Sequence, residues 1–153
     1  MSEGMKRVLI VDALNAYLRA YIVDPSISSN GQPIGGLKGF IKILQKLVRE
    51  TKPDNIIIAW DGPDGSRKRK NMDKNYKAGR KPIRLNRAIR NLTEDEELAN
   101  KMWQQKRIIE YMNEMPIIQV LIAQIEADDI ISYVTQMKHY DGWQKIIVSN
   151  DKD

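Results

Sequence analysis

The sequence predicts an α/β fold in which helices flank a parallel β-sheet. Four short apolar runs, rich in isoleucine and valine, alternate along the 153 residues with segments of helical periodicity. No apolar run reaches the ~18 residues that a membrane-spanning helix needs. Strands that alternate with helices are typical of a doubly wound parallel sheet with right-handed crossovers, and a chain of this length fits one domain or a piece of one.

The expected strands are the four apolar runs. We expect the first at Arg7 to Asp12, the second at Asn55 to Asp61, the third at Ile117 to Ile122 and the fourth at Lys145 to Ser149. β-Branched residues dominate these runs, as they do in strands. Pro116 stands directly before the third run and is expected to open it.

Helices are expected between the strands. Residues 13–21 have mixed helical character, and turn residues make 24–36 a loop. From Leu37 to Val48, apolar residues recur at intervals of three and four, which predicts an amphipathic helix that Pro53 terminates. Thr93 and Glu96 form a capping-box pattern and predict a long helix at 94–114. Its expected apolar face carries Leu98, Met102, Ile109 and Met112, and a last helix is marked by Ile130, Ile131, Val134 and Met137.

All four expected strands lead into carboxylates. The acids are Asp12, Asp61, Glu126, Asp128, Asp129, Asp151 and Asp153. Because the carboxyl ends of parallel strands share one edge of a sheet, where open α/β folds bind ligands, we expect these acids to converge. Crowded carboxylates shift one another's protonation, so the expected occupant is a hard divalent cation with a preference for oxygen, Mg²⁺ or Mn²⁺. The sequence therefore predicts a metal-dependent enzyme.

Each acidic group also has an ordinary structural explanation. Asp12 and Asp61 can cap helices or occupy turns, and the helix dipole favours acids in a first turn by ~0.3 to 1 kcal/mol each. These explanations account for each group separately. They do not explain why all four strand ends carry the same functional group, so we favour a common site.

The composition excludes several other kinds of site. There is no cysteine and one histidine, His139, so thiolate sites, His-pair zinc motifs and a Ser-His-Asp triad are not expected. The N-terminus lacks the apolar stretch of a signal peptide, which favours a cytoplasmic location. The glycines at 31–39 match neither a dinucleotide-binding fingerprint nor a P-loop. The three tryptophans are interpreted as packing residues: Trp60, Trp103 and Trp143.

The net charge of +5 conceals a strong asymmetry. Residues 66–90 contain eleven Lys and Arg and one acid, whereas the rest of the chain has fourteen basic and nineteen acidic residues. A basic stripe beside an acidic metal pocket suits a polyanion such as nucleic acid. A solvated, flexible charge run is the alternative explanation for this segment. Tyr76 offers an aromatic face for stacking a base, and Lys77 and Arg80 are spaced to share one helical face.

Six motifs resemble those of the 5′ nuclease family. In chain order they are VDALNAYLRA, SSNGQPIGGLKGFIKIL, WDGPDGSRKRK, NYKAGRKP, IEADDII and SNDKD, and they cover nearly the whole chain from Met5. That family includes the 5′-3′ exonuclease domain of bacterial DNA polymerase I, phage 5′ exonucleases and flap endonucleases. The resemblance implies a PIN-like or resolvase-like catalytic domain over residues 5–153.

The resemblance also implies roles for particular residues. The seven acids would hold metal, two ions in the complete protein, and residues 66–92 would form a basic arch around a 5′ single-stranded DNA flap. Lys77 and Arg80 would act at the scissile phosphate. The remaining implied nucleic-acid contacts are Asn15, Tyr17, Arg67, Tyr76 and Lys81. The implied enzyme is a 5′-3′ exonuclease and flap endonuclease of DNA replication and repair. No interaction surface stands out in the sequence, so a monomer is the default expectation.

One departure from the family leaves alternatives open. Family members continue into a helix-hairpin-helix region that grips the duplex and adds aspartates to the second metal, and this sequence does not contain it. A non-catalytic nucleic-acid-binding fragment is therefore one alternative. A PIN-type ribonuclease is the other, because it would share the strand-end acids and would not need the YKAGR segment.

Overall fold

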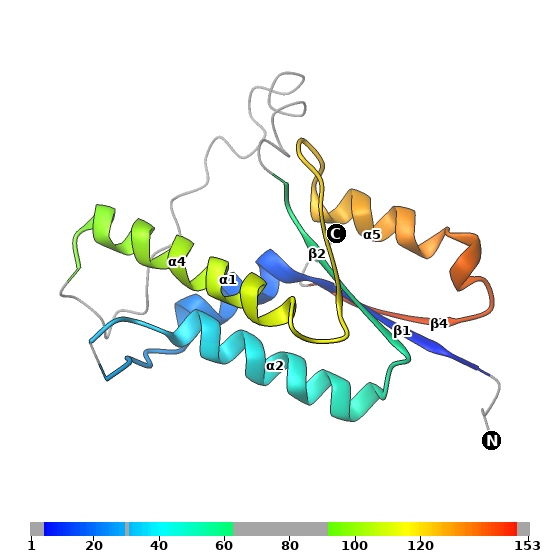
Figure 1. Ribbon diagram of the computed structural model, residues 1–153, viewed down its shortest axis with the longest axis horizontal. Coiled ribbons are helices and arrows are strands. Elements are labelled where there is room, and N and C mark those ends of the chain that lie inside the picture. The colour runs from blue at the N-terminus through cyan, green and yellow to red at the C-terminus, as the bar shows by residue number, and fades with distance from the viewer. Residues whose placement is uncertain (1–4, 30, 63–91, 150–153) are drawn as a thin grey trace.

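The sheet is parallel and has four strands in the part of the chain that the structure describes. The computed structural model describes residues 5–29, 31–62 and 92–149. The strands are β1 (Arg7–Asp12), β2 (Asn55–Trp60), β3 (Ile118–Leu121) and β4 (Gln144–Val148). They lie in the order β3-β2-β1-β4 (Figure 1). The predicted fold class is confirmed, and each predicted strand boundary lies within one residue of the observed one.

The helices also follow the expected order. They are α1 (Ala13–Val23), α2 (Gly35–Thr51), α4 (Glu94–Met112), α5 (Ala127–Thr135) and a short 3₁₀ helix, η1 (Lys138–Tyr140). The capping box is present, because the Glu96 N–H donates to Thr93 Oγ1 at 3.2 Å and the Thr93 N–H donates to Glu96 Oε1 at 3.1 Å. Met137, expected in the last helix, lies beyond its end. None of the described helices is long and apolar enough to cross a membrane.

Helices cover both faces of the sheet. Side chains alternate along each strand, so Leu9 and Val11 of β1 pack with α1, α2 and α4, whereas Val8 and Ile10 pack against α5. Figure 1 shows α2 and α5 on opposite sides of the strands. The apolar side of α5 faces the sheet, where Ile130, Ile131 and Val134 pack with Val8 and Ile10. Burial on both faces explains why the strand sequences are almost continuously apolar.

The strand register brings all four strand ends to one edge, since Leu121 at the end of β3 also pairs with Trp60 at the end of β2. Asp12 pairs with Ala59 of β2, and Val11 pairs with both Ile58 of β2 and Val148 of β4. We call the edge where the four strands end the carboxyl edge. The first two predicted acidic groups follow β1 and β2 at this edge.

A glycine in the N-terminal part of α2 allows α1 and α2 to pack closely. A methyl group added at Gly39 would lie 2.6 Å from the Cβ of Ala20 in α1, too close for any larger residue. The α1 and α2 backbones therefore approach each other at small residues, where dispersion contacts are dense. This packing explains glycines that match no phosphate-binding motif.

The predicted apolar face of α4 is wrong in the N-terminal half of the helix. Leu98 and Met102 are 52% and 62% exposed. Trp103, interpreted as a packing residue, is 42% exposed. The face that is buried carries Glu97, Asn100, Gln104, Ile108 and Met112. The amphipathic pattern is thus shifted around the helix, with polar residues at its buried positions.

Hydrogen bonds explain why amides occupy the buried positions of α4. Gln104 is fully buried, and its Oε1 accepts from the Leu37 N–H at 2.9 Å while its Nε2 donates to Asn100 Oδ1 at 2.7 Å. Asn100 Nδ2 donates to the Pro33 carbonyl at 3.0 Å. Leu37 lies in the first turn of α2, where backbone N–H groups have no partner within the helix. The two amides therefore connect α4 to the start of α2.

Candidate functional site

Asp12 is held at the junction between β1 and α1. It is the N-cap of α1, and its Oδ1 accepts a hydrogen bond from the Asn15 N–H at 3.3 Å. The side chain is half-buried. This is the helix-capping role that was the structural alternative for Asp12, and it fixes the carboxylate at the carboxyl edge.

Asp61 connects the end of β2 to the start of α5. Its Oδ1 accepts a hydrogen bond from the Ala127 N–H at 2.6 Å, across 66 positions of sequence. The Gly62 N–H beside it donates to the Ile125 carbonyl at 2.9 Å. An N–H in the first turn of α5 thus finds its acceptor in a carboxylate from another strand.

Gly62 makes this connection possible because only a residue without a side chain fits there. A methyl group at Gly62 would overlap the Ile122 carbonyl oxygen and would lie 2.5 Å from its carbonyl carbon and 3.1 Å from the Cα of Ala123. The chain after β2 therefore lies against the turn after β3. We call residues 61–62 and 122–127 the backbone clamp.

The clamp sets the position of the third acidic group. Glu126 is the N-cap of α5 and only 6% exposed, whereas Asp128 and Asp129 are exposed in the first turn. The helix dipole favours negative charge at all three positions. Two of the four predicted acidic groups, Asp61 and the start of α5, are thus joined directly.

The donor set has the right chemistry for a divalent cation. Every candidate ligand is a carboxylate, and Mg²⁺ and Mn²⁺ prefer such oxygen ligands. Within residues 5–29, 31–62 and 92–149, however, no three acidic, histidine or cysteine side chains form a group able to hold a metal ion. The structure brings together Asp61 and α5 but does not gather the five described acids into one ligand cluster, so the seven-acid metal site stays a prediction.

Tyr17, predicted to contact nucleic acid, belongs to the core. Its side chain is 0% exposed, and its hydroxyl donates to the Lys101 carbonyl at 2.6 Å. Burial, with a smaller contribution from Tyr21, raises the pKa of the Tyr17 phenol. A buried phenol cannot contact a ligand in this conformation. Asn15 is half-buried, and its predicted contact is untested.

The remaining predicted site residues lie outside the described part of the chain. They are Arg67, Tyr76, Lys77, Arg80, Lys81, Asp151 and Asp153. The same holds for nearly all of the predicted basic arch at 66–92.

The sequence analysis did not identify the clamp or the role of Gly62 in it. The available signal was a glycine directly after a strand-end aspartate, which is a position where backbones approach closely. The partner in the clamp, the Ala127 N–H, is a main-chain group and leaves no trace in a side-chain pattern.

Comparison with known proteins identifies the family. The sequence profile of the 5′-3′ exonuclease N-terminal resolvase-like domain matches residues 7–153. This chain belongs to that family. The predicted resemblance to 5′ nucleases is therefore confirmed, and the family's resolvase-like domain agrees with the parallel sheet.

Curated relatives of the chain are longer than it is. It is 30% identical over 149 residues to flap endonuclease Xni of Shewanella woodyi, covering 97% of this chain and 51% of the relative. It is 28% identical over 149 residues to DNA polymerase I of Bacillus subtilis, covering 97% of this chain and 15% of the polymerase. The 5′-3′ exonuclease of Aquifex aeolicus is 27% identical over 152 residues, of which this chain covers 47%. The chain thus spans about half the length of its nuclease relatives.

Solved structures show the same fold. The T5 D15 protein co-crystallised with metal ions superposes with a TM-score of 0.68 at 18% identity, covering 96% of this chain and 50% of that protein. A T5 D15 flap endonuclease variant in complex with DNA and metal ions gives a TM-score of 0.64 at 16% identity, again covering 96% and 50%. These likenesses establish the architecture, a parallel sheet flanked by helices, independently of the sequence motifs.

Proposed function

We propose that this chain is the catalytic part of a divalent-metal-dependent 5′-3′ exonuclease and flap endonuclease that hydrolyses DNA phosphodiesters near a 5′ end. The observation that carries the proposal is the clamp, because it joins Asp61 to the acidic start of α5 at the edge where β1 ends with Asp12, in a chain of the 5′-3′ exonuclease family. Its relatives include flap endonucleases and a 5′-3′ exonuclease. A monomeric, cytoplasmic protein fits this role.

The proposed roles of the site residues follow from their charges. The carboxylates at the carboxyl edge, with Asp151 and Asp153, would hold Mg²⁺ or Mn²⁺, two ions in the complete protein. A bound divalent ion supplies Lewis acidity and lowers the pKa of a coordinated water. Lys77 and Arg80 would neutralise charge that develops on the phosphate, and Arg67 and Lys81 would hold neighbouring phosphates. Tyr76 would stack on a base, and Asn15 would contact the strand near Asp12.

The test compares two acid-to-amide variants at opposite edges of the sheet. Asp128→Asn removes an exposed acid at the start of α5, whereas Asp141→Asn removes an exposed acid just before β4, at the other edge. We measure Mn²⁺ binding by titration calorimetry and Mg²⁺-dependent cleavage of a labelled 5′-flap DNA. Asp128→Asn is expected to lower Mn²⁺ affinity and the cleavage rate by at least ~10- to 100-fold, the effect of removing an outer partner of a metal site. Asp141→Asn is expected to match the wild type in both measurements.

The outcomes separate the proposed enzyme from its alternatives. Equal metal affinity and cleavage in both variants would refute the metal assignment. Cleavage of an RNA flap of the same sequence, with none of the DNA, would select a PIN-type ribonuclease. DNA binding that weakens steeply with salt, without cleavage by the wild type, would select a non-catalytic binding fragment.

A further inference from the structure

We propose that the outer face of α2 is a second DNA-binding surface, which holds the backbone of double-stranded DNA alongside the carboxyl edge. This inference rests on the proposed function, since it assigns a further contact to the same substrate. The surface consists of four exposed cations, and we call it the α2 stripe: Lys38, Lys42, Lys46 and Arg49.

The spacing of the α2 stripe places its cations in one line. They follow one another at intervals of four, four and three residues, which puts all four within an arc of about 80° at 3.6 residues per turn. The stripe is about 16 Å long at 1.5 Å per residue. Along that length, each strand of a duplex presents about five phosphates at 3.4 Å per nucleotide of axis.

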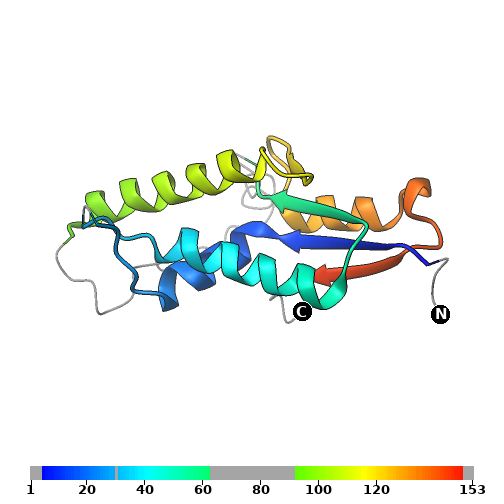
Figure 2. The same ribbon diagram turned by 60° about the horizontal axis from the view of Figure 1, so that its bottom comes forward.

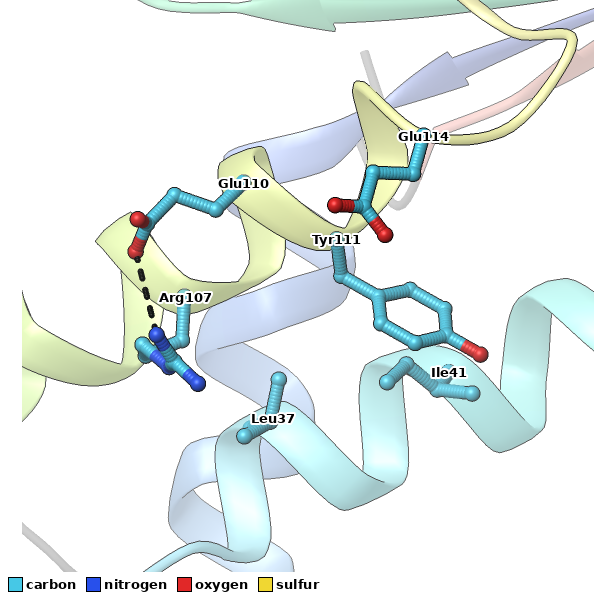
Figure 3. A pocket seen from close by; sticks show the side chains of 6 residues that line it. All are labelled: Leu37, Ile41, Arg107, Glu110, Tyr111 and Glu114. Atoms are coloured by element: carbon cyan, nitrogen blue, oxygen red, sulfur yellow. Dashed lines mark ion pairs between the residues drawn. The ribbon is translucent and has the colours of Figure 1, made fainter.

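The stripe faces away from the protein core. The buried residues of α2 include Phe40 and Leu44, and Figure 3 shows Leu37 and Ile41 turned toward α4, where they line a cavity of about 400 Å³ with Tyr111. By helical geometry Phe40 and Leu44 lie opposite the cations, whereas Leu37 and Ile41 lie toward α4, on the side of the helix between the buried face and the stripe.

Few anionic groups neutralise the stripe. From Gly35 to Arg49, α2 contains no acid, and Glu50 follows at its end. Lys38 and Lys42 lie close enough to Asp24 for their charges to help lower the pKa of its carboxyl group. Lys38 also donates a long 3.5 Å hydrogen bond to Ser26 Oγ. In the part of the chain that the structure describes, the only ion pair is Arg107 with Glu110 on α4.

The path of α2 carries the stripe past the carboxyl edge. α1 continues from Asp12 at that edge, and α2 starts beside the end of α1, where Gly35 lies against Asp24. α2 then runs back along α1 to β1 and ends before the start of β2, as Figure 2 shows. A duplex bound to the α2 stripe would therefore run parallel to α2 and pass the carboxyl edge. A rigid duplex suits a straight row of cations because its phosphates are already ordered.

The experiment measures how DNA affinity depends on salt. The affinity for a 20-base-pair duplex is determined by fluorescence anisotropy in EDTA, so that cleavage cannot contribute. The test variant is Lys42→Gln with Lys46→Gln, and the matched control is Lys106→Gln with Lys138→Gln, two exposed lysines on α4 and η1. Circular dichroism confirms that both variants are folded.

We expect the test variant to lose about 1.8 from the slope of log K against log [salt], at ~0.9 per phosphate contact. That loss corresponds to an affinity up to about 60-fold weaker at 0.1 M salt. The control is expected to keep the wild-type slope. An unchanged slope in the test variant, an equal loss in the control, or a loss seen with single strands but not with duplex would each overturn the proposal. A slope loss in a protein that cleaves no DNA would support the stripe and reject only the nuclease assignment.

Discussion

Substitution of Gly62 by alanine tests whether the backbone clamp holds the candidate site together. The added methyl group would overlap the Ile122 carbonyl oxygen and lie 2.5 Å from the carbonyl carbon, so the two chain segments must separate. Both clamp hydrogen bonds then lengthen, the 2.9 Å bond from Gly62 to Ile125 and the 2.6 Å bond from Ala127 to Asp61.

The expected loss is about 3 to 7.5 kcal/mol in the free energy of unfolding, as the sum of three contributions. Overpacking contributes roughly 1 to 3 kcal/mol. The two weakened hydrogen bonds add roughly 0.5 to 1.5 kcal/mol for the neutral bond and 1.5 to 3 kcal/mol for the bond to the carboxylate. In a domain of this size, each kcal/mol lost from the free energy of unfolding lowers the Tm by roughly 2 to 4 °C.

Gly142→Ala is the matched control, because Gly142 has a φ of 81° and no atom within 4 Å of the added methyl group. It carries only the cost of left-handed backbone in a residue with a side chain, roughly 1 to 2 kcal/mol. Urea denaturation measures both variants, and amide hydrogen exchange at Ala127 reports on the clamp. If Gly62→Ala is no less stable than Gly142→Ala and the Ala127 amide keeps its protection, the clamp does not exist as described.

Three further substitutions test other parts of the structure. Gln104→Leu leaves the Leu37 N–H and Asn100 Oδ1 without their partner and should lower the free energy of unfolding by roughly 2 to 6 kcal/mol, whereas half-buried Gln105→Leu should change it little. Equal urea midpoints for the two variants would refute the buried network. Hydrogen bonds from Ser26 lower the pKa of Asp24, so the stabilisation from the Asp24 carboxylate is present above the unfolded pKa of about 4 and is lost as pH falls through the folded pKa. Asp24→Asn should therefore make the free energy of unfolding fall less steeply in acid, and an unchanged acid dependence counts against this explanation. Burial raises the pKa of Tyr17, so the stabilisation from the protonated phenol is present below about pH 10 and is lost as pH rises further. The free energy of unfolding of Tyr17→Phe should therefore fall less steeply in alkali than that of the wild type, and parallel pH dependences would contradict this.

The strands could be predicted because their environment is uniform. β1 and β2 are covered on both faces, so nearly every position is apolar and the run itself marks the strand. The boundaries are also marked, since Asp12 caps the next helix and Gly62 stops β2. The common carboxyl edge then follows from parallel pairing alone.

The buried face of α4 could not be predicted from apolar periodicity. Asn100 and Gln104 are buried because the first turn of α2 and the loop before it present backbone groups that need partners. These groups belong to segments more than sixty residues away, so nothing within the sequence of α4 indicates them. Leu98 and Met102 give the stronger local signal and are exposed.

In the candidate site, too, the side chains could be predicted from the sequence, whereas the backbone contacts that join them could not. The sequence places acids at the strand ends, and the register brings Asp12 and Asp61 to neighbouring positions on one edge. Which acids are joined depends on the Ala127 N–H and on the close approach at Gly62, neither of which is a carboxylate. In the metal site proposed above, Oδ2 of Asp61 would be the oxygen that binds the cation, because Oδ1 already accepts the hydrogen bond from Ala127. The clamp thus fixes the position of Asp61 relative to the start of α5, and this contact between distant segments could not be read from the positions of the acids alone.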